Sequence, residues 1–281
     1  HDIDVVRFWT KARLINEAET CLQLARTTLS KASMRLTKSA ASILSLRDPY
    51  WNFDQIMALE ERYGFTSSFY MFGGGDHPAD ARYTIDDRRM RTLATAMMKR
   101  GHEVGLHGSF DSFNHLERLG QEKQALESIV GAITSIRQHY LRFHVQDTFS
   151  IHEQLGISCD VSLGFAGHEG FRAGIYHPYR PYDFQNSRPF DVIEIPLTIM
   201  DGTLSGQQYR GLAPQQAWES VESLLTTVKK YEGVIVLLWH NSHLDRFEHR
   251  EYFDVYDKTL RWIADRGGIG TSVRGLLKRR G

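Results

Sequence analysis

The sequence predicts an α/β protein made of repeated β/α units around a parallel sheet, and two observations support this. Short apolar runs rich in β-branched and aromatic residues alternate with longer segments of helical period. A length of 281 residues suits one barrel domain around one core, and no low-complexity tract or Gly/Ser linker divides the chain. We therefore expect residues 1–281 to form a single domain of about seven strands, as a closed or nearly closed barrel.

Each strand is expected at an apolar run, and each helix at a segment of helical period that opens on or near a capping residue. The expected strands lie near residues 1–6, 66–72, 102–106, 140–143, 157–160, 192–198 and 233–239. The expected helices cover residues 52–63, 86–100, 116–138, 147–155, 214–231 and 251–265. Residues 16–46 should add one or two helices beside the barrel. Residues 164–186, broken by Gly, Pro and aromatics, should form a long loop of the kind that contacts substrates or packs on the wall.

The composition excludes several classes of protein. Lys plus Arg and Asp plus Glu number 34 each, so no basic field draws the chain to nucleic acid or to an anionic membrane. Cys21 and Cys159 share no motif, which argues against a disulfide framework and favours a reducing, cytoplasmic location. No apolar run reaches the roughly 18 residues of a membrane span, and no signal peptide opens the sequence. Because the chain begins inside a candidate catalytic motif, we expect upstream residues outside this numbering. The oligomeric state is not predicted.

The segment HDID places two carboxylates, Asp2 and Asp4, two residues apart. On a strand both point to one face and lie within a few Å of each other. Their repulsion is relieved if one binds a proton or if a cation holds both. The alternative is that one Asp caps a loop and the other lies on the surface.

His107 ends the strand HEVGL, and Asp111 follows four residues later. If a helical turn starts there, both lie on one face and, with Asp4, complete a three-ligand site of the kind that a catalytic divalent ion occupies. In the alternative, His107 is a buried, hydrogen-bonded imidazole and Asp111 caps the helix from residue 116.

Further polar residues end other predicted strands. His240 follows the buried run VIVLLW, at the edge where barrel enzymes gather reacting groups, although a core histidine is the alternative. Arg142 and Asp160 each close a strand and are expected to pair with one another or with Asp2. Trp239 either stacks on a sugar face or belongs to the core.

In order along the chain, these segments resemble the motifs of the polysaccharide-deacetylase family, also called carbohydrate esterase family 4 or the NodB homology domain. GHEVGLH, ending at His107, is the most specific segment. The resemblance covers almost the whole chain and implies a distorted (β/α)7, TIM-like barrel. It implies Asp2 as catalytic base, Asp4 and His107 as metal ligands, and His240 as general acid. Arg142 and Asp160 are then the groups that orient the base.

Two positions depart from the family pattern. Ile3 separates acids that are usually adjacent, and Asp111 stands where the family has its second metal-binding histidine. With Asp111 as third ligand the site has one histidine and two carboxylates. The resemblance implies one divalent ion, zinc, and the oxygen-rich ligand set leaves cobalt, manganese and magnesium open.

The FRAG turn within residues 164–186 resembles a loop of a bacterial branch of the family that is associated with surface-polysaccharide clusters. Arg172, His177 and Tyr179 of this loop, together with Trp239, are the expected substrate contacts. The resemblance implies a metal-dependent hydrolase that removes an N-acetyl or N-formyl group from a sugar of a surface glycan, such as lipopolysaccharide or O-antigen, or from its precursor. The alternatives are a catalytically silent barrel that binds glycan and an amidohydrolase acting on a small non-sugar amide.

Overall fold

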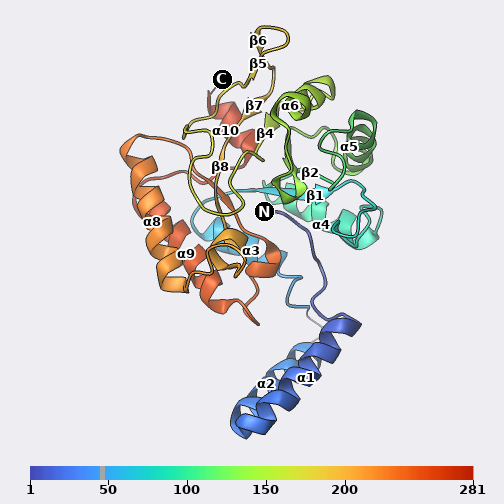
Figure 1. Ribbon diagram of the computed structural model, residues 1–281, viewed down its shortest axis with the longest axis vertical. Helices are drawn as coiled ribbons and strands as arrows, with labels where there is room; N and C mark the ends of the chain where they lie inside the picture. The colour runs from blue at the N-terminus through green and yellow to red at the C-terminus, as the bar shows by residue number, and fades with distance from the viewer. Residues whose placement is uncertain (45–47, 281) are drawn as a thin grey trace.

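In the computed structural model, residues 1–44 and 48–280 are described, and they form an α/β fold around parallel strands (Figure 1). The strands are β1 Ser68–Phe72, β2 Glu103–Gly108, β3 Ser135–Gln138, β4 Cys159–Asp160, β5 Tyr182–Asp183, β6 Arg188–Pro189, β7 Ile193–Glu194, β8 Leu197–Met200 and β9 Val236–Leu238. The helices are α1 Lys11–Thr27, α2 Leu29–Leu44, α3 Phe53–Arg62, α4 Arg88–Lys99, α5 Leu116–Val130, α6 Val145–Gln154, α7 Asp201–Ser205, α8 Pro214–Lys230, α9 Arg250–Asp265 and α10 Val273–Arg280. Two 3₁₀ turns, η1 His139–Leu141 and η2 Asn241–His243, follow β3 and β9.

The strands make an incomplete ring. A five-stranded parallel sheet runs in the order β1-β2-β3-β4-β7, and β8 pairs with β9 in a second parallel ladder. The N-terminal segment joins the first sheet through a parallel bridge from Asp2 to Tyr70. Pro196, which has no N–H to donate, lies between β7 and β8 where the ladder is interrupted. Counting β7–β8 as one position, the ring has seven positions, as expected for a distorted (β/α)7 barrel, and its ladders do not close within the described residues.

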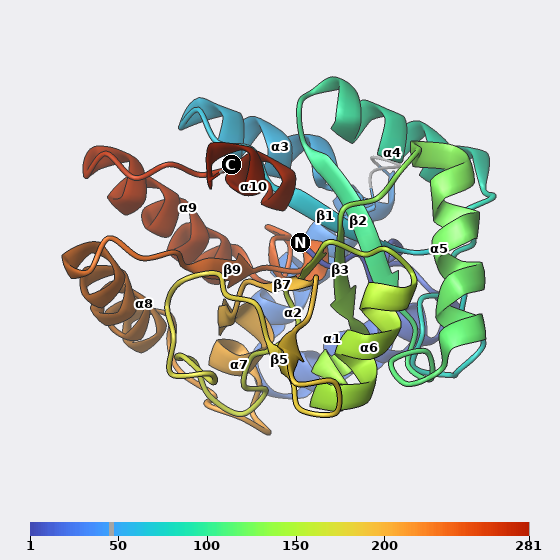
Figure 2. The same ribbon diagram turned by 90° about the horizontal axis from the view of Figure 1, so that it is seen from above.

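Helices cover the outside of this ring, with α3, α4 and α5 beside β1 and β2 and with α8 and α9 on the opposite side (Figure 2). All five residues of β1 and all six of β2 are buried, as parallel strands covered on both faces require. Gly105 lies in the middle of β2, where a Cβ would come within 2.6 Å of the ring of Tyr70 and within 2.9 Å of the Ser135 carbonyl oxygen. The second glycine of GHEVGLH is therefore required by close packing between strands.

One helix is shorter in the structure than the sequence analysis predicted. The helix expected over residues 116–138 ends at Val130, because Gly131 follows in a left-handed conformation with φ 76°. The chain then forms β3 over Ser135–Gln138, so the strand expected at residues 140–143 is absent there. Residues His139–Leu141 form a turn instead, in which Tyr140 and Leu141 have φ values of 57° and 53°. Such left-handed residues cost about 1–3 kcal/mol each and are frequent at functional sites.

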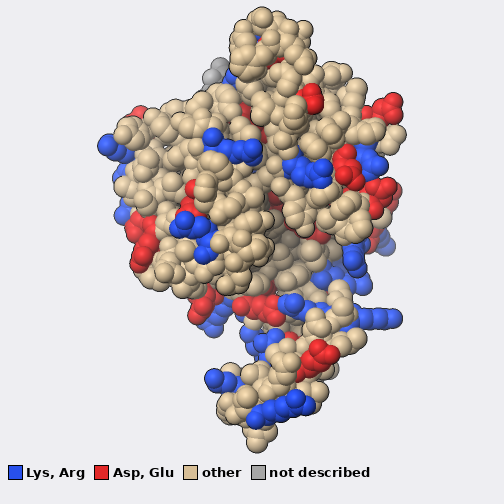
Figure 3. All heavy atoms as spheres, in the orientation of Figure 1, with Lys and Arg blue, Asp and Glu red and all other residues tan. Residues whose placement is uncertain are grey.

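The segment predicted as one or two helices forms the α1–α2 hairpin, which projects away from the barrel (Figure 1). Arg35 of α2 donates two hydrogen bonds to Glu17 of α1, at 2.9 and 2.6 Å, and so joins the two helices. Figure 3 shows Lys and Arg side chains gathered on this hairpin and beside the place where it meets the barrel. None of the helices in residues 1–44 and 48–280 has the length and apolar character that a membrane span needs.

Candidate active site

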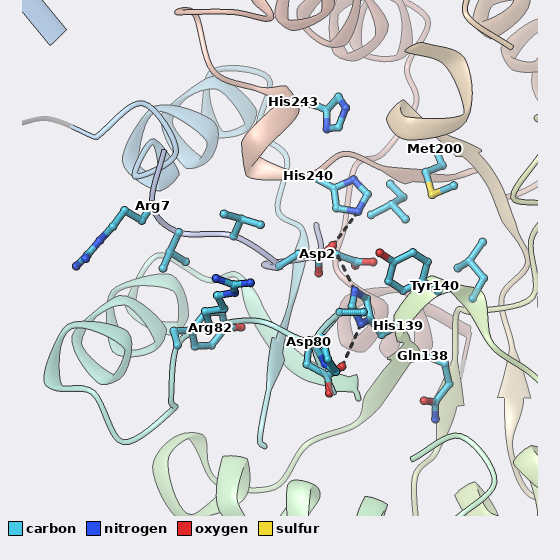
Figure 4. Close-up of a pocket in the computed structure, with 18 of the residues that line it drawn as sticks. Asp2, Arg7, Asp80, Arg82, Gln138, His139, Tyr140, Met200, His240 and His243 are labelled. Atoms are coloured by element: carbon cyan, nitrogen blue, oxygen red, sulfur yellow. Dashed lines mark hydrogen bonds and ion pairs between the residues drawn. The ribbon is translucent and has the colours of Figure 1, made fainter. Parts of the chain in front are cut away.

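Polar residues that follow several strands meet in one cavity of about 940 Å³ (Figure 4). They come from the N-terminal segment, from the ends of β3 and β8, and from the turn that follows β9. Because the carboxyl ends of parallel strands lie at the same edge of a barrel, residues distant in sequence come together there. The cavity walls include Asp2, Asp4, His139, His240 and His243.

Asp2 is buried and paired with an arginine. Its Oδ1 accepts a hydrogen bond from Nη1 of Arg137 at 2.8 Å, and its Oδ2 lies 3.6 Å from Nε2 of His107. Burial by itself raises the pKa of Asp2, but the charges of Arg137, His107 and His240 hold it below its usual range. Asp2 is therefore an ionised carboxylate with one oxygen held in place.

Asp4 faces two histidines, His107 on β2 and His139 directly after β3. Its Oδ1 lies 3.1 Å from Nε2 of His107, and its Oδ2 lies 3.8 Å from Nε2 of His139. One ligand atom from each of the three residues lies within 4.8 Å of the others. Asp4 Oδ1 and His107 Nε2 are buried without a hydrogen-bond partner among the described residues. A buried polar atom without a partner destabilises the folded state unless water, an ion or a ligand binds it.

In each histidine, a contact at Nδ1 orients the ring so that Nε2 lies toward Asp4. Nδ1 of His107 lies 2.8 Å from the carbonyl oxygen of Arg137, so this nitrogen is the donor, and Nε2 carries the lone pair when the ring is neutral. Nδ1 of His139 lies 3.3 Å from Oδ1 of Asp80, which holds that ring in the same way. Phe72 contacts both rings edge to face, at centroid distances of 4.6 and 4.9 Å. Carbonyl and carboxylate partners of this kind support metal-binding histidines, so Asp4, His107 and His139 fit a divalent cation.

The third ligand predicted from the sequence is not the residue that the structure supplies. Asp111 is absent from the Asp/His groups of the described chain and lies near Arg118, whose pKa its charge helps to raise. His115, four residues further on, is exposed and caps α5 by accepting a hydrogen bond from the Arg118 N–H at 3.3 Å. The third position is filled by His139 after β3, so the group contains two histidines and one carboxylate.

The partner of Asp2 is also a different arginine from the one expected. Arg142 lies over the rings of Phe110 and Phe113, at 3.8 and 4.6 Å from their centroids. Arg137, inside β3, takes the expected role, and its Nε donates to the Val161 carbonyl oxygen at 3.1 Å. The strand was placed several residues late in the sequence analysis, and the arginine assigned to its end was displaced with it.

Asp160, at the end of β4, is fully buried behind this pair. It accepts hydrogen bonds from the backbone N–H and the hydroxyl of Ser162, at 2.7 and 2.9 Å. Its charge helps to raise the pKa of Arg137 against the effect of burial. Asp160 therefore acts on the pair of Arg137 and Asp2 through its charge.

His240 forms a dyad with an acid that the sequence analysis missed. Its Nδ1 lies 2.7 Å from Oδ1 of Asp201, and its backbone N–H donates to Oδ2 of the same carboxylate at 2.7 Å. Its Nε2 points toward the cavity, 3.4 Å from Oδ2 of Asp4. Burial alone lowers the pKa of His240, but the Asp201 carboxylate and the other acids raise it to about 10. The dyad therefore presents a protonated imidazole to the cavity.

Asp201 also lies 3.5 Å from Nδ1 of His243, and these two residues with His240 form a second Asp/His group. Both oxygens of Asp201 already bind His240. This group is therefore a hydrogen-bonded dyad of His240 and Asp201, with His243 as a neighbour.

Four expected substrate contacts lie away from the cavity. Trp239 is 0% exposed and packs on Tyr256 at a centroid distance of 5.1 Å, so it belongs to the core and cannot stack on a sugar in this structure. Arg172 donates to the Gly164 carbonyl oxygen at 3.0 Å. His177 packs on Tyr176, and Tyr179 forms a backbone bridge with Glu194. From residues 164–186, only Ala166 is among the described residues that line the cavity.

The residues missed from the sequence are Arg137, His139, Asp80 and Asp201. Asp201 directly follows the apolar strand VIEIPLTIM, so the reasoning applied to His240 would also have selected it. The other three carried no comparable signal, because the end of β3 was hidden in a longer helical pattern and Asp80 lies in a loop.

We predict that Arg137→Met lowers the kcat/KM of the hydrolysis proposed below at least ~10-fold, because Asp2 loses the charge that keeps it ionised and oriented. Arg142→Met is the matched control and should leave kcat/KM unchanged, since the Arg142 guanidinium lies over two phenylalanine rings and makes no ion pair among the described residues. Steady-state kinetics check both, with circular dichroism to confirm folding. If Arg142→Met lowers kcat/KM and Arg137→Met does not, Arg142 is the functional arginine.

No family model matches this chain, and no curated protein is similar to it in sequence. Solved structures are similar in fold. A putative polysaccharide deacetylase from Mycobacterium smegmatis superposes with a TM-score of 0.61 at 13% identity, covering 99% of this chain and 88% of that one. A probable polysaccharide deacetylase from Pseudomonas aeruginosa PAO1 gives 0.59 at 13% identity, covering 89% and 76%. The Puue allantoinase gives 0.57 at 12% identity, covering 86% and 72%.

These similarities extend over most of the chain and include the parallel sheet and its surrounding helices. At such low identity they establish the fold and leave the activity open. The fold predicted from HDID, GHEVGLH and LLWHN is confirmed, and the chain has the polysaccharide-deacetylase fold.

Proposed function

We propose that this protein is a divalent-metal-dependent hydrolase that removes an N-acyl group, acetyl or formyl, from a sugar of a bacterial surface glycan or its precursor. The supporting observation is that a base candidate, Asp2, two possible metal ligands, Asp4 and His139, and an acid candidate, His240, line one cavity. His107 lies 3.1 Å from Asp4 and completes the group of possible ligands, and Asp201 lies 2.7 Å from His240. The surface-glycan class rests on the resemblance of the FRAG loop.

Asp4, His107 and His139 would hold the ion. Two imidazole nitrogens and one carboxylate oxygen suit zinc in a catalytic site, and cobalt and manganese accept the same ligands. A divalent cation in such a site polarises a carbonyl group and makes a water molecule more acidic.

Two side chains of the protein, Asp2 and His240, would accept and donate the protons of the reaction. Asp2, held through Oδ1 by Arg137, takes a proton from the attacking water on its other oxygen. The water oxygen forms a bond to the acyl carbon and the C–N bond breaks. His240 donates the proton of Nε2 to the departing nitrogen, while Asp201 stabilises the imidazolium from Nδ1. The products are a free amino sugar and acetate or formate.

We predict that Asp201→Asn lowers kcat roughly 10²-fold or more with little change in KM, because an amide cannot stabilise the imidazolium that serves as acid. Steady-state kinetics on the most active acyl sugar provide the measurement. Asp191→Asn is the control, because the Asp191 side chain is 82% exposed and pairs only with Arg180 among the described residues. A normal kcat in the folded Asp201 variant would remove the dyad from the mechanism.

A substrate screen tests the function itself. The protein, loaded in turn with zinc, cobalt and manganese, is incubated with N-acetyl and N-formyl amino sugars, both free and phosphate-linked, and released acetate or formate is measured. Hydrolysis of at least one sugar, lost on chelation, is the expected result. Binding without hydrolysis in every case would identify a silent glycan-binding barrel. Because an allantoinase shares the fold, small non-sugar amides complete the panel, and activity on these alone would overturn the sugar assignment.

A further inference from the structure

Three arginines line the cavity apart from the Asp/His cluster. Arg7 follows Asp4 in the N-terminal segment, Arg82 lies in the loop between β1 and α4, and Arg89 lies in the first turn of α4. Figure 4 shows Arg7 and Arg82 on the side of the cavity away from Met200 and Gln138. All three arginines are exposed to the space that a ligand would occupy.

None of these three guanidinium groups pairs with a carboxylate among residues 1–44 and 48–280. Other arginines with solvent-accessible side chains do: Arg91 pairs with Asp86, Arg100 with Glu61 and Arg188 with Glu153. Asp87 also lines the cavity, but its carboxylate caps α4 by accepting the Arg89 backbone N–H at 2.8 Å. The arginine side of the cavity therefore has an excess of positive charge, although the chain as a whole has none.

Arg89 is held in place by an aromatic ring. Its guanidinium carbon lies 3.6 Å from the centroid of Trp51, which also lines the cavity. Stacking of this kind orients the guanidinium plane and leaves its N–H groups at the edge available to a ligand. One arginine of the three is thus preorganised.

We propose that Arg7, Arg82 and Arg89 bind a phosphate or pyrophosphate group attached to the acylated sugar. The inference rests on the proposed function and specifies its substrate as a phosphorylated sugar. Guanidinium forks bind phosphate oxygens through paired, charge-assisted hydrogen bonds. A single carboxylate would neutralise only one of the three charges, whereas a pyrophosphate matches the set better. A cavity of about 940 Å³ lies at the upper end of the range for small-molecule sites and has room for a sugar with such a group.

Binding is tested without catalysis. Pyrophosphate is titrated calorimetrically into metal-free protein, so that chelation and turnover play no part. We expect the double variant Arg82→Gln/Arg89→Gln to bind at least ~10-fold more weakly than the wild type, and both to weaken with salt. Arg266→Gln is the matched control, because Arg266 also stacks on a tryptophan, Trp262 at 4.2 Å, and lies outside the cavity. Equal binding by all three proteins would overturn the proposal.

Kinetics then separate the sources of the phosphate. The substrates are a methyl N-acetylglucosaminide, N-acetylglucosamine 1-phosphate, its uridine diphosphate derivative and a short-chain prenyl-pyrophosphate sugar. The ratio of kcat/KM for phosphorylated over uncharged sugar should fall at least ~10-fold in the double variant, and Arg82→Lys should restore part of the loss in Arg82→Gln. A preference for the nucleotide or for the prenyl compound identifies the source. If the wild type hydrolyses phosphorylated and uncharged sugars with equal kcat/KM, the phosphate-binding role of the arginines is overturned while the proposed function stands. If no sugar is hydrolysed, the proposed function fails, and pyrophosphate binding still tests the arginines.

Discussion

Asp2→Asn is expected to lower kcat for deacylation by roughly 10²–10⁴-fold, with the metal content and substrate affinity nearly unchanged. The physical reason is that an amide keeps the hydrogen bond from Arg137 but cannot accept a proton from water. Asp2 lies 3.6 Å from His107 and makes no direct contact with His139 among the ion pairs of the described chain, so the ligand group should survive.

The measurement is a single-turnover assay on metal-loaded enzyme, accompanied by metal analysis and a thermal melt. Asp54→Asn is a suitable control, because that side chain is 89% exposed and belongs to helix α3 on the outer surface. If the folded, metal-loaded Asp2→Asn protein keeps the wild-type rate, the base must be sought elsewhere, and Asp4 would be the next candidate.

His139→Gln is expected to weaken divalent-metal binding by at least ~100-fold, because one of three protein ligands is replaced by a much poorer one. Asp111→Ala is expected to bind the ion as the wild type does. This pair discriminates between the ligand set predicted from the sequence, with Asp111, and the set proposed from the Asp4, His107 and His139 group. Glutamine keeps most of the volume of the side chain, which lies beside Phe72 and is 5% exposed.

Competition with a chromophoric chelator gives the affinities, and the visible spectrum of the cobalt-loaded proteins reports the ligand geometry. Both readouts are independent of turnover, so they remain valid if the substrate is not the one proposed. Full affinity in His139→Gln together with loss in Asp111→Ala would restore the ligand set predicted from the sequence, with Asp111 as third ligand.

Some parts of this site follow directly from local sequence patterns. Asp2, Asp4, His107 and His240 each lie at or beside a strand with an apolar pattern, and parallel strands place such residues at one barrel edge. Their meeting in one cavity therefore follows from the pattern once the fold class is known. Asp201 directly follows β8, so the same reasoning would have selected it.

Other parts depended on where one helix ends. The periodic pattern continued past Val130, so the strand that follows was placed at residues 140–143, and Arg142 was selected in place of Arg137. The ligand His139 was overlooked for the same reason. A shift of a few residues changes which side chain reaches the barrel edge, because successive residues on a strand point to opposite faces.

The amino-acid sequence alone determined the fold class, the positions of Asp2, Asp4, His107 and His240 at or near strand ends, and the even balance of charge. These depend on periodicity and composition, which are local properties of the chain. Only the tertiary structure decided that His139 lies beside Asp4 and His107, that Asp201 holds His240 and that Trp239 lies in the core. Each of these is a contact between segments distant in sequence, and the relative placement of such segments is set by packing and backbone geometry. The same reason applies to Arg7, Arg82 and Arg89, which no sequence pattern joins and which face one cavity only when the chain is folded.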